Sequence, residues 1–574
     1  MKYKLLLFIL TICSLTANAR KTQVTSATQI NGGSWSAGDT IEWKNGTWTN
    51  QVVSFKASGT AAQPIVLMAQ TPGSVILTGT SHIGFSGSYI EVSGLFFKNG
   101  NLNTGSEIVG FRTSSSEFAY NCQLTNCAIV DCNPTDSTID SKWVSLYGAN
   151  NRVDHCSFQN KSNMGTLLVV WLTAGIVPNH IVDQNYFGYR NSNVDAAGAE
   201  LNGQEIMRLG DSSTSMQTAG IQVTNNFFEH CNGEIETISN KSCGNYYTNN
   251  VFYECNGMLT LRHGNSCTVD GNYFFGNKNS SSGGVRIIGE NHKVYNNYFE
   301  KLGGSGFRSA VCIVRGKLNS LANEYFQVKN ALVAFNTMVD CSNAFTINYN
   351  SSSTYTMPPI GTVIANNNVY NTSSSNTAVT ISQTDPAMDI VWNNNLINQG
   401  KYSNFTATGT QVITGKDPKL VLAGTSTNMY EPGSTSALLS YTTTDYPEIA
   451  VDIRGRNRGT TAKVAGCSQT SGATTRIMPN RSTTGASFFN GVLTDIKPVS
   501  LDNDFKSFVS NRKLITNTNV TGKLRFFDIS GKTVMEQNLQ QGISSSNMPN
   551  KAGIYILSFV AVNGKNYSEK IIID

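Results

Sequence analysis

Charged residues near the middle of the chain have the types and spacing that acid–base chemistry needs. Glu234 and Glu236 are separated by one residue, so in a β-strand both carboxylates leave the same face, about 7 Å apart along the backbone. Lys241 follows in the next turn, and Arg262 and His263 end the equivalent stretch one repeat later. This pattern predicts a cation site beside two groups that transfer a proton. The alternatives are a solvated acidic face over an apolar core and an ordinary turn lysine.

The neighbouring repeats supply further polar groups to the same face. Aligning the Asn-Gly pairs of successive repeats puts Glu236 beside Thr260, about 4.8 Å away. By the same alignment Ile238 lies beside Arg262. The preceding coil offers an amide, a carboxylate and a guanidinium, and the following coil a second guanidinium. The residues expected around this face are Asn202, Glu205, Arg208, Glu234, Glu236, Lys241, Arg262, His263 and Arg286.

This mixture of acids and bases favours an anionic sugar polymer as the ligand. Carboxylates and an amide oxygen form a hard-oxygen site suited to Ca²⁺ rather than Zn²⁺. Several cations around such a site suit an anion lying across the face. For a uronic acid polymer the natural reaction is β-elimination, because a cation on the carboxylate acidifies the C5 proton. A base removes that proton and an acid protonates the leaving oxygen at C4, and a lysine serves as base where nearby positive charge lowers its pKa.

A degenerate repeat of the form V-x-x-N-x-F determines the fold class. Copies begin at Val153, Val182, Val223, Tyr247, Val269, Val294, Val333, Ile364 and Val391. Each copy is a short strand with alternating apolar residues, and such coils bury their apolar face only by stacking. The asparagine tolerates a left-handed backbone, and its amide can bond to its counterpart in the next coil. The repeats are too short for propeller blades, so we predict an all-β chain: a right-handed parallel β-helix followed by a small C-terminal β-sandwich.

Composition divides the chain into four parts. Residues 1–19 have a positive start, an apolar run too short to span a bilayer and a small-residue cleavage site, which is typical of a signal peptide. We predict the catalytic β-helix over 20–467, a Ser/Thr-rich linker over 468–504 and the β-sandwich over 505–574. The net charge of +5 gives no indication of nucleic-acid binding, and no later stretch is apolar enough for a membrane span.

Eleven cysteines remain after the predicted cleavage, an odd number that excludes complete pairing. Four of them occupy one position of the repeat, at Cys132, Cys231, Cys255 and Cys341. This spacing predicts an internal column of small apolar side chains. Disulfides and metal ligation are the alternatives.

Several motifs resemble those of polysaccharide lyase family six, the β-helical alginate lyases and chondroitinase B. They are E-I-E-T-I-S-N-K-S at 234–242, L-R-H-G at 261–264, N-G-Q-E-I-M-R-L-G at 202–210 and G-G-V-R-I-I-G-E-N-H at 283–292. The segments at 38–48 and 92–100 also match. The resemblance extends over about residues 25–465, and the motifs occur in the order and spacing of the family.

The resemblance implies a role for each candidate residue. It implies calcium ligation by Asn202, Glu234 and Glu236, with Lys241 as the base and Arg262 as the acid. It implies substrate contacts from Glu205, Arg208, His263 and Arg286, and Arg286 favours the alginate branch. Arg308 and Arg315 are further candidates for binding sugar carboxylates, although this part of the chain departs from the family pattern.

The end of the chain resembles the C-terminal sorting domain of the type IX secretion system of Bacteroidetes. The match consists of D-I-S-G-K at 528–532, A-G-I-Y-I-L at 552–557 and K-I-I-I at 570–573. It implies export through the periplasm of a Gram-negative bacterium and a secreted or cell-surface protein. The domain's usual N-P near its start is missing here, and a carbohydrate-binding module is the alternative.

The leading functional hypothesis is a secreted alginate lyase. A lyase acting on dermatan or chondroitin sulfate is the alternative within the same chemistry. A β-helical glycoside hydrolase would need an acid–base carboxylate pair, and the sequence has no N-T-D or paired-Asp motif of that kind. A non-enzymatic adhesin or glycan-binding β-helix is the remaining alternative, and it would tolerate loss of Lys241.

Overall fold

The computed structural model describes most of the chain. It covers residues 19–489 and 505–573, apart from 196–197, 199, 351, 410, 424–428, 444, 459–462, 511–512, 529–531, 548–552 and 563–565. Nearly all of the predicted signal peptide and residues 490–504 of the predicted linker lie outside the described residues. The chain divides into two compact units, residues 1–490 and 491–574. Within the described residues, no helix is both long and apolar enough to cross a membrane.

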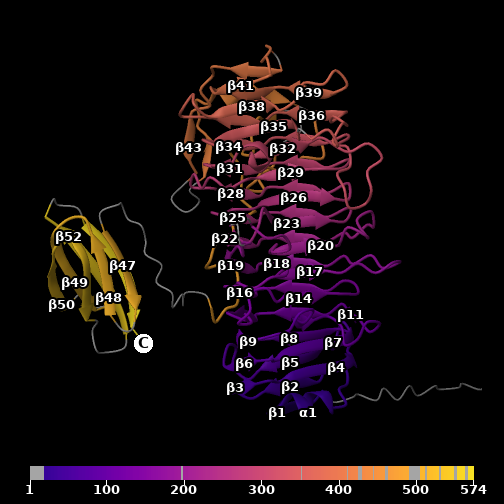
Figure 1. The fold of residues 1–574 in the computed structure, drawn as a ribbon, viewed down its shortest axis with the longest axis vertical. Helices are drawn as coiled ribbons and strands as arrows, with labels where there is room; N and C mark the ends of the chain where they lie inside the picture. The colour runs from indigo at the N-terminus through magenta and orange to yellow at the C-terminus, as the bar shows by residue number, and fades with distance from the viewer. Residues whose placement is uncertain are drawn as a thin grey trace, which may run out of the picture. The chain divides into compact units, whose positions relative to one another are not determined.

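The first unit is a right-handed parallel β-helix, as predicted (Figure 1). Three parallel sheets run along it, and each coil contributes one strand to each sheet. The first sheet contains, in spatial order, β1 (Lys21–Val24), β2 (Thr40–Trp43), β5 (Ile65–Ala69), β8 (Ile90–Ser93), β12 (Gln123–Thr125), β15 (Arg152–Asp154), β18 (Ile181–Asp183), β21 (Gln222–Thr224), β24 (Tyr246–Thr248), β27 (Thr268–Asp270), β30 (Lys293–Tyr295), β33 (Leu332–Ala334), β36 (Thr362–Ala365) and β39 (Ile390–Asn393).

The second sheet carries the candidate site residues on its outer face. Its strands are β11 (Ala119–Tyr120), β7 (His82–Ser88), β10 (Glu107–Gly110), β14 (Lys142–Leu146), β17 (Leu168–Val170), β20 (Met207–Leu209), β23 (Glu236–Lys241), β26 (Met258–His263), β29 (Val285–Ile287), β32 (Val311–Val314), β35 (Asn343–Tyr349), β38 (Thr377–Ile381) and β41 (Lys401–Ser403), with β4 (Val52–Ser58) paired to β7.

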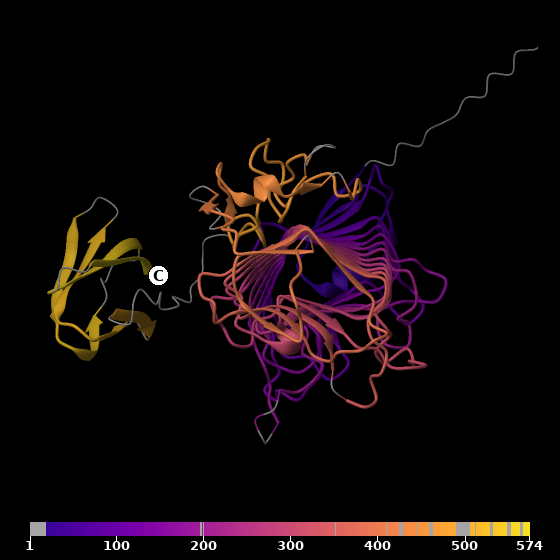
Figure 2. The ribbon, with the colours of Figure 1, turned by 90° about the horizontal axis from the view of Figure 1, so that it is seen from above.

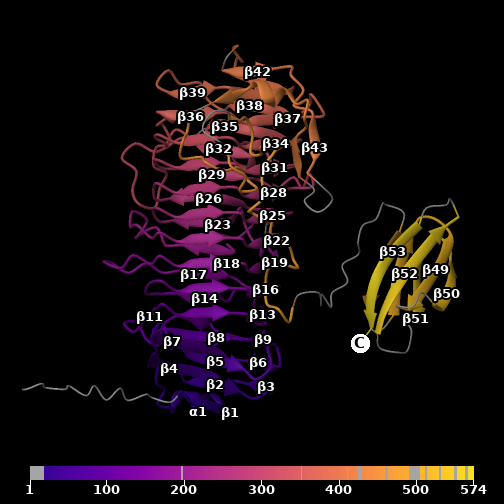
Figure 3. The same cartoon turned by 180° about the vertical axis from the view of Figure 1, so that it is seen from behind.

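The third sheet closes the coil and is seen best from behind (Figure 3). Its strands are β3 (Gly46–Thr49), β6 (Val75–Gly79), β9 (Leu95–Gly100), β13 (Ala128–Val130), β16 (Ser157–Gln159), β19 (Tyr186–Asn191), β22 (Phe227–Asn232), β25 (Val251–Tyr253), β28 (Tyr273–Phe275), β31 (Tyr298–Glu300), β34 (Thr337–Val339), β37 (Asn368–Tyr370), β40 (Asn395–Ile397) and β42 (Val412–Thr414). A short helix, α1 (Ala27–Asn31), lies in the first coil, and Ser26 caps its N-terminus.

A buried asparagine ladder joins most of the coils, with Cys156 in place of the asparagine in the copy that begins at Val153. The side-chain oxygen of Asn250 accepts from the backbone and side-chain N–H groups of Asn226, both at 3.0 Å, and the same pattern recurs in successive coils. Its members are Asn185, Asn226, Asn250, Asn272, Asn297, Asn336, Asn367 and Asn395. The residue before each ladder asparagine takes the left-handed backbone, for example Asn249 with φ 54°. The left-handed backbone and the ladder hydrogen bonds, both predicted for one asparagine, therefore belong to two successive residues.

Apolar columns fill the interior between the sheets. The rings of Phe158, Phe187, Phe228, Phe252, Phe274 and Phe299 stack in successive coils with centroids 4.6–5.0 Å apart. All four cysteines of the predicted column are buried, and the eleven cysteines of the described residues are free thiols. Only Cys231 and Cys255 of the four lie in successive coils, so the stacked rings rather than a continuous column of thiols pack one coil above the next.

The last part of the first unit differs from the predicted domain boundaries. The parallel coil ends at Thr414 rather than near residue 467, and the chain then runs back along the outer face of the third sheet (Figure 2). This returning segment contains β43 (Leu420–Leu422), β44 (Tyr430–Pro432), η2 (Ala437–Ser440), β45 (Thr442–Thr443) and β46 (Lys463–Val464). We call residues 415–489 the strap.

The strap is bound to the coil by apolar and ionic contacts. Met429 and Ile453 pack against aromatic residues of the third sheet, and Arg481 pairs with Glu229. Phe489 meets Phe96 edge-on, with centroids 5.4 Å apart. Residues 468–489 are therefore packed structure, although their Ser/Thr-rich composition predicted a linker. Their apolar and arginine anchors are too widely spaced to form a pattern that the sequence reveals.

The second unit is a small antiparallel β-sandwich, as predicted. One sheet contains β47 (Phe505–Ser510), β48 (Lys513–Thr518) and β51 (Gly542–Asn547), and the other β50 (Thr533–Leu539), β49 (Gly522–Asp528), β52 (Gly553–Ala561) and β53 (Asn566–Ile573). Leu514 of the first sheet shares a core with Leu524, Phe526 and Phe559 of the second. The unit therefore has a core of its own.

Replacing a ladder asparagine should destabilise the coil. Asn250→Ala removes donors to Val223 O (2.8 Å) and Asn272 Oδ1 (2.9 Å) and leaves two N–H groups of Asn226 without their acceptor. We expect a loss of about 2–4 kcal/mol in the free energy of unfolding, because these groups are buried. Urea denaturation followed by circular dichroism measures it. Gln222→Ala, at an exposed position of β21, is the control and should change the value by less than about 0.5 kcal/mol.

Candidate active site

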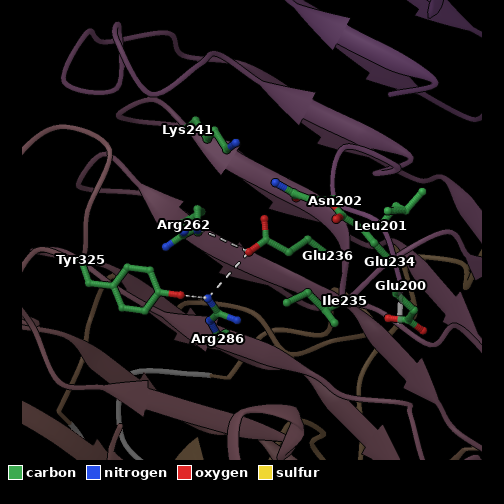
Figure 4. A pocket seen from close by; sticks show the side chains of 10 residues that line it. All are labelled: Glu200, Leu201, Asn202, Glu234, Ile235, Glu236, Lys241, Arg262, Arg286 and Tyr325. Carbon is green, nitrogen blue, oxygen red and sulfur yellow. Dashed lines mark hydrogen bonds and ion pairs between the residues drawn. The ribbon is translucent and has the colours of Figure 1, made fainter. Parts of the chain in front are cut away.

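A pocket on the outer face of the second sheet collects most of the predicted site residues (Figure 4). Its volume is about 310 Å³, and β23, β26 and β29 form its floor. Its lining residues are Glu200, Leu201, Asn202, Glu234, Ile235, Glu236, Lys241, Arg262, Arg286 and Tyr325. Six of the nine predicted residues are therefore in one pocket. Glu205, Arg208 and His263 are adjacent to it in the same coils but do not line it.

Two bulges set the register of the site and correct the predicted alignment. Glu236 pairs with Met258 rather than Thr260, and Ile238 pairs with Leu259 rather than Arg262. Strand β23 carries one extra residue between Glu236 and Ile238, and β26 carries Arg262 as an extra residue before His263 pairs with Lys241. The prediction failed because it assumed coils of equal length. Phe228 pairs with Phe252, 24 positions on, but Glu236 pairs with Met258, only 22 positions on, so the bend after Gly233 is two residues longer than the one after Gly257. A bulge re-aims the side chains beside it.

Gly257 permits close packing at the first of these bulges. A Cβ on Gly257 would lie 2.5 Å from the backbone nitrogen of Thr237 and 2.8 Å from the carbonyl oxygen of Glu234. The coil of β26 could not approach the acidic turn with a larger residue there. Glu234 itself precedes β23, which begins at Glu236, so the two carboxylates reach the pocket from a bend and a strand rather than from one strand.

Glu236 stands between one hydroxyl and two guanidinium groups. Ser239 donates a hydrogen bond of 2.5 Å to its Oε2. Its Oε1 lies 3.7 Å from Nε of Arg262 and 3.8 Å from Nη2 of Arg286. Both arginine contacts are ion pairs beyond hydrogen-bond distance. Glu236 is therefore oriented outward, away from the hydrophobic interior, and its Oε1 has no close partner among the groups described.

The surroundings of Glu234 disfavour the charged form of its carboxyl group. Burial, together with the nearby charges of Glu205 and Glu236, raises the pKa of Glu234 from 4.5 to about 9. Three carboxyl groups thus crowd the same corner, where a bound cation would relieve both their desolvation and their mutual repulsion.

The donor set fits a hard cation. Asn202, Glu234 and Glu236 all line the pocket, and their oxygens are the ligands that Ca²⁺ takes in proteins. No group of three or more His, Cys, Asp or Glu side chains in the described part of the chain is arranged to hold a metal ion. The set here has two carboxylates and one amide, so it would need oxygen ligands from solvent or substrate to complete the coordination of Ca²⁺.

Two buried cations lie beneath the acidic corner, and the sequence analysis missed both. Arg190 of β19 is fully buried, and it donates to the carbonyl oxygens of Glu205 (3.1 Å) and Gly165 (2.8 Å). Burial lowers its pKa to about 10, against the opposing attraction of Glu205 and Glu234. Lys161 is also buried and donates to the Asn163 side chain at 2.6 Å, and burial followed by repulsion from Arg190 lowers its pKa well below the usual range. Arg190 braces the loop of Glu205 and partly offsets its charge, and Lys161 supports the neighbouring loop at Asn163.

The three remaining predicted residues surround the pocket. Glu205 accepts a hydrogen bond of 2.7 Å from Thr166, and the guanidinium of Arg208 lies 5.1 Å from the ring centre of Trp171. Burial and the charges of Arg262 and Lys241 lower the pKa of His263 to about 3. His263 is therefore a neutral imidazole at the pH of any ordinary assay, and it can donate or accept a hydrogen bond but carries no charge.

Tyr325 lines the pocket and was not predicted. It lies in the long connection between β32 and β33, and its hydroxyl accepts a hydrogen bond of 2.7 Å from Arg286. The long spacing between the repeat copies at Val294 and Val333 indicates an insertion there. Nothing in the sequence indicates that an aromatic residue of this insertion returns to the site.

Two other arginines considered as sugar ligands are already engaged. Arg315 donates to Gln383 and to the carbonyl oxygens of Tyr355 and Thr356, and it pairs with Asp385 at 2.9 Å. The suggestion that it binds sugar carboxylates is therefore wrong for this structure. Arg308 donates to the carbonyl oxygen of Ser281 and lies 3.7 Å from the pocket residue Glu200.

Fold and site together define a parallel β-helix protein with an acidic pocket, rimmed by lysine and arginine, on one outer face. A sequence model of the chondroitinase B family matches residues 24–439. The chain therefore belongs to the chondroitinase B family, and it is homologous to the polysaccharide lyases of family 6. No curated protein matches it.

Solved structures support this assignment. The chain is 31% identical to AlyGC, a PL6 family alginate lyase, with a TM-score of 0.70 over 83% of this chain and 60% of AlyGC. It is 27% identical to a mannuronic acid specific family 6 lyase from human gut microbiota, with a TM-score of 0.58 over 67% and 86% of the two chains. It is 26% identical to the PL6 family polysaccharide lyase Pedsa3628 from Pseudopedobacter saltans, with a TM-score of 0.58 over 66% of this chain and 92% of that one. The chain thus matches only 60% of the length of AlyGC.

The raised pKa of Glu234 predicts a stability difference that depends on pH. As pH rises from about 4.5 to about 9, the unfolded chain loses this proton before the folded chain does, so the fold loses stability across this window. Glu234→Gln carries no charge at any pH and should escape that loss. In chelator, we expect its unfolding temperature to equal that of the wild type near pH 4.5 and to exceed it increasingly up to pH 9, by calorimetry. Glu290→Gln, at a surface ion pair, is the control, and a pH-independent gap for Glu234→Gln would contradict the interpretation.

Proposed function

We propose that the protein is a secreted polysaccharide lyase that cleaves alginate by calcium-assisted β-elimination. The observation that carries this proposal is that Lys241 and Arg262 line the same pocket as Glu234 and Glu236, with Glu236 lying between Arg262 and Glu234 (Figure 4). A proton acceptor, a cationic donor and a hard-oxygen cation site thus share about 310 Å³. The family assignment supports the same reaction class.

The residues of the pocket divide the reaction among them. Lys241 takes the C5 proton of the uronate unit, and Arg262, on the next coil, donates to the C4 oxygen as the glycosidic bond breaks. Calcium held by Asn202, Glu234 and Glu236 would neutralise the substrate carboxylate and so acidify the C5 proton. Arg286 and Arg208 bind carboxylates of the sugar chain, and His263 supplies a neutral hydrogen-bonding group. Glu205 orients this side of the site through its bond with Thr166.

Alginate is favoured over a sulfated glycosaminoglycan as the substrate. The solved relatives named above include an alginate lyase and a mannuronic acid specific lyase, at 31% and 27% identity. Each uronate unit of alginate carries a carboxylate, so the carboxylate of a neighbouring unit can meet Arg286 while Arg262 contacts the leaving oxygen. A dermatan or chondroitin sulfate lyase remains the alternative, because the matching family model takes its name from chondroitinase B.

Export and surface delivery are part of the proposal. The positive start and apolar run of residues 1–19 support secretion across the inner membrane, and the ending of the C-terminal β-sandwich supports sorting by a type IX secretion machinery. An alginate lyase needs such a route, because its polymeric substrate lies outside the cell.

An absorbance assay tests the reaction directly. Incubation with polymannuronate should raise the absorbance near 235 nm, because elimination leaves a conjugated double bond that hydrolysis does not. Lys241→Ala and Arg262→Ala should each lower kcat by at least about 10³-fold, because each removes a group that transfers a proton. Lys293→Ala, at an exposed site on the first sheet, is the control. Full activity in Lys241→Ala would show that another group removes the C5 proton, and no rise in absorbance with the wild type would support a non-enzymatic or different function.

Metal removal tests the cation site separately. We expect chelator to lower activity on alginate and added Ca²⁺ to restore it, and we expect Ca²⁺ to raise the unfolding temperature of the wild type. Glu236→Gln should weaken Ca²⁺ binding by at least about tenfold in calorimetric titration, because it removes one of two carboxylate ligands. Ser213→Ala, in an exposed turn, is the control for both measurements. Equal Ca²⁺ affinity in Glu236→Gln would place the ion elsewhere.

A further inference from the structure

Tyr325 touches both arginines of the pocket at once (Figure 4). The guanidinium carbon of Arg262 lies 4.2 Å from the centre of its ring, and Arg286 donates a hydrogen bond of 2.7 Å to its hydroxyl. The same guanidinium of Arg286 lies 5.5 Å from the ring centre. One side chain therefore holds two cations that come from successive coils.

Hydrogen bonds and a ring contact support Tyr325, although it comes from an insertion. The backbones of Gly316 and Met357 exchange two hydrogen bonds of 2.8 and 2.9 Å, and the N–H of Lys317 donates to the carbonyl oxygen of Tyr325 at 2.8 Å. The ring of Tyr355 packs behind that of Tyr325, with centroids 4.9 Å apart. Ser215 also donates to the carbonyl oxygen of Ala322, which ties the insertion to another loop of the second-sheet face.

The arginines need such a support because their other contacts are long. Glu236 is 3.7 and 3.8 Å from them, beyond hydrogen-bond distance. Within the described residues, neither Nη1 of Arg262 nor Nε of Arg286 has a hydrogen-bond partner, and both atoms are buried. A guanidinium with free donors reorients easily unless an aromatic face or an acceptor fixes its plane.

We propose that Tyr325 is a positioning residue with two separable roles. Its ring face orients Arg262 for the leaving oxygen, and its hydroxyl orients Arg286 for a substrate carboxylate. The inference rests on the proposed lyase function and deepens it. The two roles predict different kinetic consequences. The contact with Arg262 matters when the glycosidic bond breaks and so affects kcat, whereas the contact with Arg286 matters for substrate binding and so affects KM.

Two substitutions separate the roles. Tyr325→Phe keeps the ring under Arg262 and removes the acceptor of Arg286, so we expect KM for polymannuronate to rise about 5–10-fold with kcat within about twofold of the wild type. Tyr325→Leu removes both contacts, so we also expect kcat to fall about 100-fold, because a misoriented Arg262 no longer points its N–H group at the leaving oxygen. Tyr355→Phe, which keeps the ring packed behind Tyr325, is the matched control and should match the wild type.

Binding measured without turnover makes the test independent of the reaction. In the Lys241→Ala background, calorimetric titration with mannuronate oligomers should show that Tyr325→Phe weakens affinity by the same 5–10-fold. Circular dichroism and unfolding temperatures establish that each variant is folded. The recovery of kcat on going from Leu to Phe at position 325 is the signature of positioning, which a purely structural role would not produce.

Each other result overturns the inference. If Tyr325→Phe and Tyr325→Leu both keep the wild-type kcat and KM, Tyr325 positions neither arginine. If Tyr325→Phe loses kcat as severely as Tyr325→Leu with KM unchanged, the phenol itself takes part in the chemistry. If the wild type produces no unsaturated product from any polyuronate, the proposed function fails, and unchanged affinity of Tyr325→Phe in the titration then rejects the positioning role as well.

Discussion

The site depends on the regular stacking of the coils, in which each coil lies one strand spacing from the next. The asparagine ladder imposes it, since each buried amide must meet its counterpart in the next coil, and a slip of one residue would leave several N–H groups unpaired. Residues at equivalent positions of successive coils are thereby brought about 4.8 Å apart. Side chains distant in sequence, such as Lys241 and His263, become neighbours on the second sheet because of this stacking.

The chemistry lies where this regularity is interrupted. An unbroken ladder would put each residue of β23 directly beside one residue of β26, and Arg262 would take a regular place in the alternation. Instead β23 gains a residue after Glu236 and β26 gains one at Arg262, so that the register recovers with Lys241 beside His263. Two opposite bulges cancel, which lets the coils on either side stay in register. The site can therefore have irregular geometry while the hydrogen bonds of the asparagine ladder are kept.

This arrangement explains what the sequence could and could not predict. The repeat gives the coil, and the alternation of charged residues on motifs such as 234–242 gives the face and six of the pocket's lining residues. The bulges and the longer bend before Glu236 were missed because superposing the Asn-Gly pairs assumes that successive coils have equal lengths. Arg190, Tyr325 and the strap were missed for a different reason: each acts through contacts between segments far apart in the chain, and no local pattern records such contacts. Arg190 has no distinguishing neighbours in sequence, yet it lies under Glu205 and Glu234.

The pocket keeps opposite charges close together but prevents them from pairing fully. Glu236 and the two arginines would gain most by closing into short, bidentate bonds, and such bonds would withdraw both signs of charge from any ligand. Ser239 holds Glu236 from one side, and Tyr325 holds the arginines from the other, which leaves gaps of 3.7 and 3.8 Å between them. The crowding of Glu205, Glu234 and Glu236 leaves their negative charge uncompensated, which favours binding of a cation. The unpaired donors of Arg262 and Arg286 favour binding of an anion. The substrate that we propose, a polyuronate with a bound divalent cation, would supply both at once, which neither a simple cation nor a neutral sugar would do.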